Sequence, residues 1–133
     1  MSAITPGAAL SISQAAERTG LSPDTLRYYE RIGLVDPVPR SAAGYRVYGE
    51  DALQWLEFVL HLRDTGMPVR DMLEFARLRR QGEHTAPLRR ALLAEHREKL
   101  REQVRRLEST LSFLDRKIDA YDGRAARAVP RGR

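Results

Sequence analysis

Residues 25–35, TLRYYERIGLV, place two arginines, two tyrosines and a glutamate on about two and a half helical turns and then reach a glycine. A helix buried in a core does not contain a run such as RYYER, because charged side chains are almost never fully buried unless they are paired. A helix this polar is typical of a surface that lies against another charged polymer.

The composition limits the protein class but does not define it. The chain has 133 residues, three histidines and no cysteine, which excludes disulfides, thiolate metal sites and cysteine catalysis. Its net charge is +5, but residues 1–123 contain 19 of the 23 basic residues and all 18 acidic ones, a net charge of +1. Basic charge alone therefore does not establish nucleic-acid binding. No apolar run approaches the roughly 18 residues needed to span a bilayer, so we expect a cytoplasmic protein with no membrane partner.

Two short helices are expected at the start of the domain. Ser13 is predicted to cap the first helix, and Gly20 to end it in the left-handed conformation. Ser22 and Pro23 are predicted to begin the second helix as its N-cap and first residue, and Gly33 to end it. Two helices joined by a short glycine-containing turn are the outline of a helix-turn-helix.

The next segment, residues 35–48 (VDPVPRSAAGYRVY), is predicted to form two short strands around Gly44, a β-wing. The wing contains Arg40 and Arg46 and has no acid after Asp36. The second helix and the wing would then present one common set of side chains, made up of Arg27, Tyr28, Tyr29, Arg40, Tyr45 and Arg46.

Two further helices are expected, at 50–64 and 69–80. The first has an apolar stripe with two aromatic residues beside it; its members are Leu53, Leu56, Leu60, Trp55 and Phe58. The second lacks a capping side chain at Pro68. Its expected buried residues are Met72, Leu73, Ala76 and Leu78, and an ordinary solvated face is expected at Arg77, Arg79 and Arg80.

Residues 85–122 are predicted to form one long helix with a heptad seam that Arg97 interrupts. The seam is too long for so small a head to cover, so a homodimer is expected, with residues 11–80 as its head. Residues 1–10 are expected to be a flexible leader and 123–133 a basic disordered tail. The seam consists of Leu93, Leu100, Val104, Leu107, Leu111, Leu114, Ile118 and Tyr121.

Three stretches together, SISQAAERTGLSPDTLRYYERIGLV (11–35), GYRVY (44–48) and LRDTGMPVRDM (62–72), resemble the MerR family of bacterial transcription regulators. The stretches WLEFVLHLRDTGM (55–67) and LDRKIDAYDG (114–123) are most similar to its aldehyde- and electrophile-responsive branch. The resemblance implies a mainly α fold: a winged helix-turn-helix head, two further helices and an antiparallel coiled-coil dimer. It also implies that the dimer binds a two-fold symmetric site in double-stranded promoter DNA. There it bends and untwists the spacer so that RNA polymerase engages both promoter elements.

Carried over by position, the resemblance makes Arg27 a major-groove contact to a base or a phosphate. Tyr28 and Tyr29 match an aromatic pair, of which one touches the DNA backbone and the other partly packs. Asp24 departs from the pattern and is expected to cap the helix or to read cytosine. The wing residues Arg40, Tyr45 and Arg46 match phosphate contacts, and Thr25 and Arg18 complete the predicted DNA-binding set.

The sequence does not identify the signal to which such a regulator would respond. In the electrophile-sensing branch a cysteine of the third helix is implicated, and His61 occupies the matching position. Imidazole is a much poorer nucleophile than a thiolate, so a partly buried histidine is the expected role, with pH or ligand sensing as the alternative. His84 and His96 have no ligand partners at useful spacing, so neither a metal nor another cofactor is expected.

Two other functional classes remain open. The protein could be a repressor or adaptor that acts by occlusion, or by recruiting a partner through the coiled coil. It could also be primarily a small-molecule binder. No Gly-rich phosphate loop or nucleophile–base motif supports an enzyme.

Overall fold

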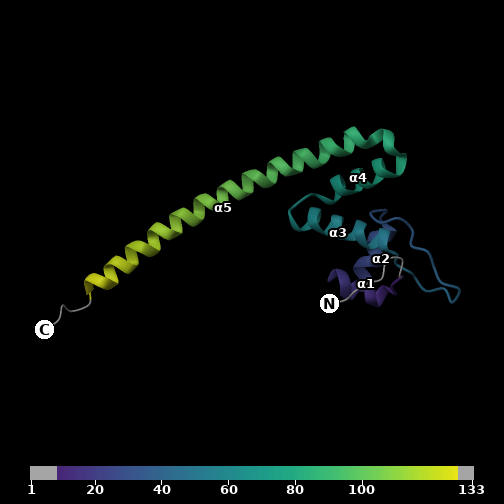
Figure 1. The fold of residues 1–133 in the computed structure, drawn as a ribbon, viewed down its shortest axis with the longest axis horizontal. Coiled ribbons are helices and arrows are strands. Elements are labelled where there is room, and N and C mark those ends of the chain that lie inside the picture. Colours follow the sequence, from purple (N-terminus) through teal and green to yellow (C-terminus); the bar gives the residue numbers. More distant parts are fainter. Residues whose placement is uncertain (1–8, 129–133) are drawn as a thin grey trace. The chain divides into compact units, whose positions relative to one another are not determined.

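The structure, a computed structural model, describes residues 9–128, and these form five α-helices and one short 3-10 helix (Figure 1). None of the helices in this range is long and apolar enough to cross a membrane. The chain divides into two compact units between Leu92 and Leu93. The elements in chain order are α1 (Ile12–Thr19), α2 (Pro23–Arg31), α3 (Glu50–Asp64), α4 (Val69–Gln81), η1 (Glu83–Thr85) and α5 (Ala86–Ala128).

The N-terminus of α1 is fixed by a reciprocal pair of hydrogen bonds. The Ser11 hydroxyl accepts from the Gln14 N–H at 3.2 Å, and the Gln14 side chain accepts from the Ser11 N–H at 2.9 Å. The prediction that Ser13 caps this helix is therefore wrong. Ser11 is the serine with a glutamine three residues later, which the capping box requires, and Ser13 lies inside the helix.

The turns on either side of α2 follow the prediction. Gly20 ends α1 with φ 78°, and Ser22 caps α2 with Pro23 at its first position. After α2, Gly33 has φ 84°, and the chain reverses so that the N–H groups of Leu34 and Val35 both donate to the Tyr29 carbonyl. Both of these side chains are buried, so the helix end is packed as well as hydrogen-bonded.

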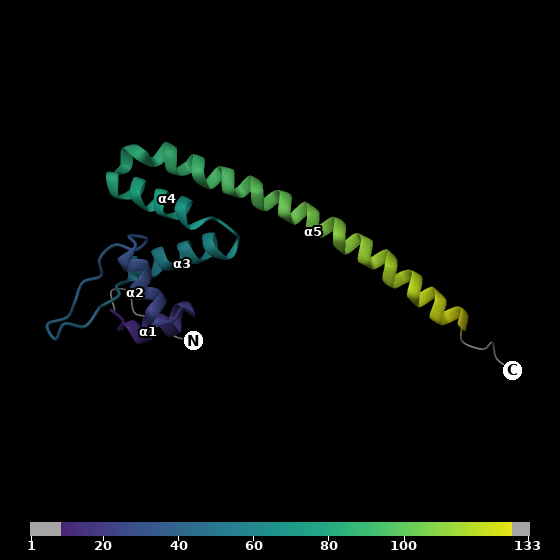
Figure 2. The same cartoon turned by 180° about the vertical axis from the view of Figure 1, so that it is seen from behind.

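The predicted pair of wing strands is wrong. Within residues 9–128 the two sides of the wing pair at one isolated antiparallel bridge, between Arg40 and Arg46. Two backbone bonds close it, of 2.7 Å from the Ser41 N–H to the Tyr45 carbonyl and of 2.8 Å from the Val47 N–H to the Pro39 carbonyl. Pro37 and Pro39 have no N–H to donate, which prevents a continuous ladder. Figure 2 shows the result, a long extended loop between α2 and α3.

The last residue of the wing, Tyr48, pairs with the segment that precedes α1. Leu10 and Tyr48 exchange two backbone hydrogen bonds, of 2.8 and 2.7 Å. Leu10 had been assigned to the predicted leader, whose residues 1–8 lie outside the described part of the chain. This bridge ties the start of the head to the last residue of the wing.

Helices α3 and α4 supply a large part of the core of the head, which also includes Ala15, Leu26 and Tyr48. On α3 the buried residues are Leu53, Leu56, Val59 and Leu62, whereas Leu60 is only partly buried. On α4 they are Met72, Phe75, Ala76 and Leu78, and Leu73 is only partly buried. An aromatic cluster takes part in this packing: the Phe75 ring lies 6.0 Å from Trp55 and 5.3 Å from Phe58, centroid to centroid. Pro68 precedes α4 without a side-chain cap, as expected.

The final helix is longer than predicted. α5 has 43 residues, about 65 Å at the usual rise per residue, and continues to Ala128 rather than ending near Asp122. The first residues of the predicted disordered tail are therefore helical, and residues 129–133 lie outside the described range. At its start, the buried Thr85 hydroxyl donates to the Leu78 carbonyl at 2.7 Å, which ties η1 to α4.

Candidate nucleic-acid interface

Helix α2 has one packed side and one polar side. Leu26 and Tyr29 are buried against the head, whereas Arg27, Tyr28 and Arg31 are exposed. The Arg31 guanidinium lies over the Tyr28 ring at 5.3 Å from its centroid, an arrangement that leaves both groups at the surface. The polar run that distinguishes this helix in the sequence therefore forms an exposed face.

The two tyrosines of α2 have different environments. Tyr28 is 44% exposed and Tyr29 only 7%. The Tyr29 hydroxyl accepts a 3.2 Å hydrogen bond from Arg63 of α3. This bond, with a second one from Arg63 to Asp64, raises the pKa of the arginine above its ordinary value. Tyr29 thus anchors α2 to α3, and a direct DNA contact by Tyr29 stays a prediction.

Arg27 forms an ion pair with Asp24, three residues earlier on the same helix, at 2.9 Å. The helix is capped by Ser22, so the expectation that Asp24 caps it is wrong; the cytosine contact stays a prediction. Exposed pairs of this kind contribute only about 0–1 kcal/mol. Arg27 can therefore leave Asp24 for a base or a phosphate at little cost.

The other predicted contacts around α2 already have partners within the head. The Thr25 hydroxyl lies 2.9 Å from the Ser22 hydroxyl, close to the helix N-terminus. Arg18 of α1 pairs with Glu57 of α3 at 3.4 Å. Both pairs are partly exposed, so Thr25 and Arg18 remain at the surface of the head.

The tip of the wing is the most exposed part of the candidate interface. Arg40 donates to the Gly44 carbonyl at 2.9 Å, and Gly44 has φ 88°, a conformation that favours glycine. Tyr45 is 74% exposed and follows this turn directly. Arg40 and Tyr45 are therefore available to a partner.

Arg46 is held differently, by the Glu30 carboxylate of α2. The two oxygens of Glu30 accept from the Arg46 Nε at 2.7 Å and from the Val38 N–H at 2.9 Å. Both charged side chains are largely covered, at 22% and 18% exposed. Burial alone would raise the pKa of Glu30, but the hydrogen bonds from Val38 and Arg46 outweigh it and hold the pKa below its ordinary value. One carboxylate thus joins α2 to both sides of the wing.

A second carboxylate, Asp36, joins the root of the wing to α4. It accepts from Arg79 at 3.1 Å and from Arg80 at 3.3 Å, and Arg80 also donates to the Gly33 carbonyl at 2.9 Å. The Arg79 guanidinium lies 4.4 Å from the centroid of the Trp55 ring. An ordinary solvated face was predicted here, and for these two arginines that prediction is wrong.

The sensing candidate is also placed differently from the prediction. His61 is exposed on α3, not partly buried, because the packed positions near the end of this helix are Val59 and Leu62. No group of three or more His, Cys, Asp or Glu residues that could hold a metal ion is found among the described residues. The structure gives His61 no special environment, and its sensing role stays a prediction.

Sequence reasoning missed the residues that position the interface, namely Glu30, Asp36, Arg63 and Arg79. Their partners lie between 8 and 44 residues away in the chain, except for the local bond of Arg63 to Asp64. No local spacing rule links such pairs. The one available signal was the presence of an acid, Glu30, within an otherwise basic helix face.

The chain matches the family model described as "MerR HTH family regulatory protein" over residues 10–77, and the model "MerR, DNA binding" over residues 53–117. It is 38% identical over 91 residues to the HTH-type transcriptional regulator AdhR of Bacillus subtilis (strain 168), covering 68% of this chain and 65% of AdhR. It is 37% identical to the uncharacterized HTH-type transcriptional regulator YyaN of the same strain, covering 84% of this chain and 89% of YyaN.

A solved structure adds a DNA complex to these similarities. The structure of HiNmlR, described as a MerR family regulator lacking the sensor domain and bound to promoter DNA, aligns with a TM-score of 0.80 at 31% identity. The alignment covers 89% of this chain and 94% of HiNmlR.

The lowered pKa of Glu30 predicts an acid-sensitive contribution to stability. Because this pKa is lower in the folded than in the unfolded chain, the stabilisation is complete above the unfolded value and is lost as the pH falls through the folded one. Glu30→Gln should lower the free energy of unfolding by about 1–3 kcal/mol at neutral pH. Denaturant titrations of both proteins at successively lower pH should show this difference shrinking.

Glu57→Gln is the matched control, since it removes a more exposed pair with Arg18 and should have a smaller effect. A difference between wild type and Glu30→Gln that stayed constant across the acid range would show that the charge of Glu30 is not what stabilises the wing.

Proposed function

Since the chain belongs to the MerR family of helix-turn-helix transcription regulators, we propose that it acts as a homodimer on a two-fold symmetric site in promoter DNA. In this proposal α2 enters the major groove and the wing lies along the phosphate backbone. The dimer bends and untwists the spacer between promoter elements, so that RNA polymerase engages both.

The observation on which this proposal rests is the common surface of α2 and the wing. Arg27 and Tyr28 are exposed on the helix, Arg40 and Tyr45 are exposed on the wing, and Glu30 hydrogen-bonds the two elements together. Arginine contacts bases through its paired donors and phosphates through its charge. A helix flanked by a basic loop at a fixed position can therefore read one groove and contact the adjacent backbone.

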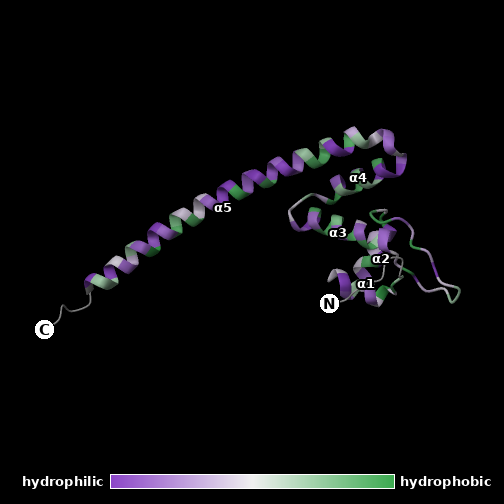
Figure 3. Ribbon diagram, viewed as in Figure 1, coloured by the Kyte–Doolittle hydropathy of each residue, from purple (hydrophilic) through white to green (hydrophobic). Residues whose placement is uncertain are grey.

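The dimer is supported by the apolar stripe of α5. Figure 3 shows that hydrophobic residues, in green, recur along α5 among hydrophilic ones, in purple. From Val104 to Tyr121 every predicted seam residue is exposed, between 46% and 65%. A row of six large hydrophobic side chains this exposed is unfavourable in water, and pairing with a second copy of the helix would bury it. The six residues are Val104, Leu107, Leu111, Leu114, Ile118 and Tyr121.

Dimer symmetry connects this seam to promoter geometry. A two-fold axis places two recognition helices at a fixed separation, which sets the spacing of the half-sites. Deforming the DNA between them costs energy that depends on its sequence, so positions that the protein never touches also affect affinity. Such a mechanism controls transcription by changing the promoter's shape.

Footprinting on DNA upstream of the gene and its neighbours tests the DNA-binding surface. Arg27→Ala should weaken binding to the protected site by about 1–3 kcal/mol if Arg27 reads a base. Arg77→Ala is the control, because Arg77 is an exposed arginine of α4 paired with Glu74. Equal losses in both variants would overturn the assignment of α2 as the recognition helix.

Transcription in vitro with the same protein and DNA distinguishes promoter remodelling from occlusion. Transcription in vitro from a promoter with an overlong spacer should rise when the wild-type protein protects the spacer. Protection accompanied only by repression would favour the alternative, a repressor that acts by occlusion.

The salt dependence of binding tests the wing. Arg46→Ala should weaken binding to all sequences alike and lower the slope of log K against log salt concentration by about one, as expected for a lost phosphate contact. Glu30→Gln keeps the Arg46 charge but loosens the wing, so it should lower affinity with little change in slope. An unchanged slope in Arg46→Ala would mean that Arg46 only ties the wing to α2.

The mass of the protein in solution tests the coiled coil. Sedimentation equilibrium should give twice the 15.1 kDa of one chain. Leu111→Glu should shift the protein to the monomer, because a charge in the seam loses apolar contact and is costly to bury. Ser112→Glu, next to it but off the seam, should remain dimeric; dissociation of both variants alike would contradict the assigned seam.

A further inference from the structure

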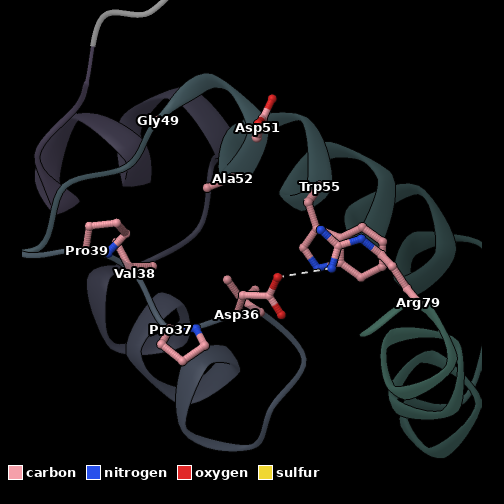
Figure 4. Close-up of a pocket in the computed structure, with 10 residues that line it drawn as sticks. Asp36, Pro37, Val38, Pro39, Gly49, Asp51, Ala52, Trp55 and Arg79 are labelled. Carbon is pink, nitrogen blue, oxygen red and sulfur yellow. Dashed lines mark hydrogen bonds and ion pairs between the residues drawn. The ribbon is translucent and has the colours of Figure 1, made fainter. Parts of the chain in front are cut away.

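A cavity of about 250 Å³ lies at the root of the wing (Figure 4). Its walls come from residues 35–39, from the first half of α3 and from Arg79 of α4. The lining is mostly apolar, formed by Val38, Ala52, Trp55 and the rings of Pro37 and Pro39. Pockets for drug-sized ligands measure about 300–1,000 Å³, so this one fits a smaller molecule with a single ring.

Arg79 gives the cavity an unused set of hydrogen-bond donors. A guanidinium has five N–H donors, and within the described residues Arg79 uses one of them, toward Asp36 at 3.1 Å. Its face lies against Trp55, which fixes the plane of the group. The Trp55 indole N–H is already committed to the Leu34 carbonyl at 2.8 Å.

The charges around Arg79 favour an anion. Asp36 is shared between Arg79 and Arg80, which leaves this cluster of three with one positive charge in excess. Asp51 also lines the cavity, but in Figure 4 its carboxylate points away from Arg79. A carboxylate would meet donors in a fixed plane, the geometry in which arginine binds it most strongly.

We propose that this cavity binds a small carboxylate with a single apolar ring. The carboxylate accepts hydrogen bonds from Arg79, and the ring lies among Ala52, Pro37, Pro39 and the edge of Trp55. Because the ligand's carboxylate shares the charge of Arg79 with Asp36 and repels that carboxylate, it loosens the bond between the wing root and α4. On the function proposed above, which this step requires, the ligand would therefore change DNA affinity.

Trp55 is the only tryptophan of the chain, so its fluorescence reports on the cavity directly. The probe is sodium benzoate, titrated into the full-length protein at constant ionic strength, with benzyl alcohol as the neutral analogue. The expected result is a saturable change in Trp55 fluorescence with benzoate. The apparent affinity for benzyl alcohol should be lower by about tenfold or more. Free N-acetyl-tryptophanamide, titrated in parallel, corrects for collisional quenching.

Two variants test the site from different directions. Arg79→Gln removes the guanidinium and should weaken benzoate binding by about tenfold or more, whereas the control Arg77→Gln on the same helix should leave it unchanged. Ala52→Leu fills the cavity without touching Arg79 and should also abolish binding. Circular dichroism establishes that each variant is folded. Calorimetric titration with benzoate replaces fluorescence for Arg79→Gln, whose substitution itself alters the surroundings of Trp55.

The outcomes are distinct. A linear, unsaturable response, equal responses to benzoate and benzyl alcohol, or full binding by Arg79→Gln would each overturn the carboxylate site. The DNA step is measured separately, as the affinity for the footprinted site with and without saturating benzoate. Loss of DNA binding without any ligand would refute the proposed function alone, and benzoate binding that leaves DNA affinity unchanged would overturn the regulatory step.

Discussion

The interaction on which the proposed DNA-binding surface depends is made by the carboxylate of Glu30. In the part of the chain that the structure describes, the two sides of the wing share only a short ladder of two backbone hydrogen bonds around Arg40 and Arg46, because Pro37 and Pro39 have no N–H to extend it. The wing is hydrogen-bonded directly to a side chain of α2, that of Glu30, which accepts from Val38 on the first part of the wing and from Arg46 on the second. A charged, largely covered contact of this kind is strong and directional. It therefore replaces several weaker bonds that the sequence does not permit.

The same principle recurs on the opposite side of the wing root. Asp36 binds two arginines of α4, and one of these also binds the carbonyl of Gly33 at the end of α2. Helix α2, the wing and α4 are thus linked through two acids, each in contact with arginine. A change at α4 has a short physical route to the wing, through Asp36, and a second route to α2, through Gly33.

Sequence reasoning succeeded where the determining groups are neighbours in the chain. Gly20, Ser22 and Pro23 act within four residues of their partners, so the helix-turn-helix could be predicted from their order. It failed where the partners are far apart. On α4 Phe75, which packs against Trp55, is buried where Leu73 was expected to be, and the pairing of Arg79 with Asp36 turns an expected solvated face into a structural contact. The alternation in YRVY predicts wing strands, but Pro37 and Pro39 lack the N–H groups that longer strands would need. The seam of α5 was readable as a pattern, but a pattern does not identify the partner that covers it.

The exposed seam of α5 has a consequence for the meaning of stability in this protein. If two chains bury it together, folding of the long helix and association are one equilibrium, and the melting temperature depends on protein concentration. Dilution would then favour dissociation and unfolding, as heating does, because each separated helix exposes an apolar stripe to water. The amount of protein present in the cell would set the fraction of chains with a complete coil. Abundance itself would thereby become part of the regulator's response.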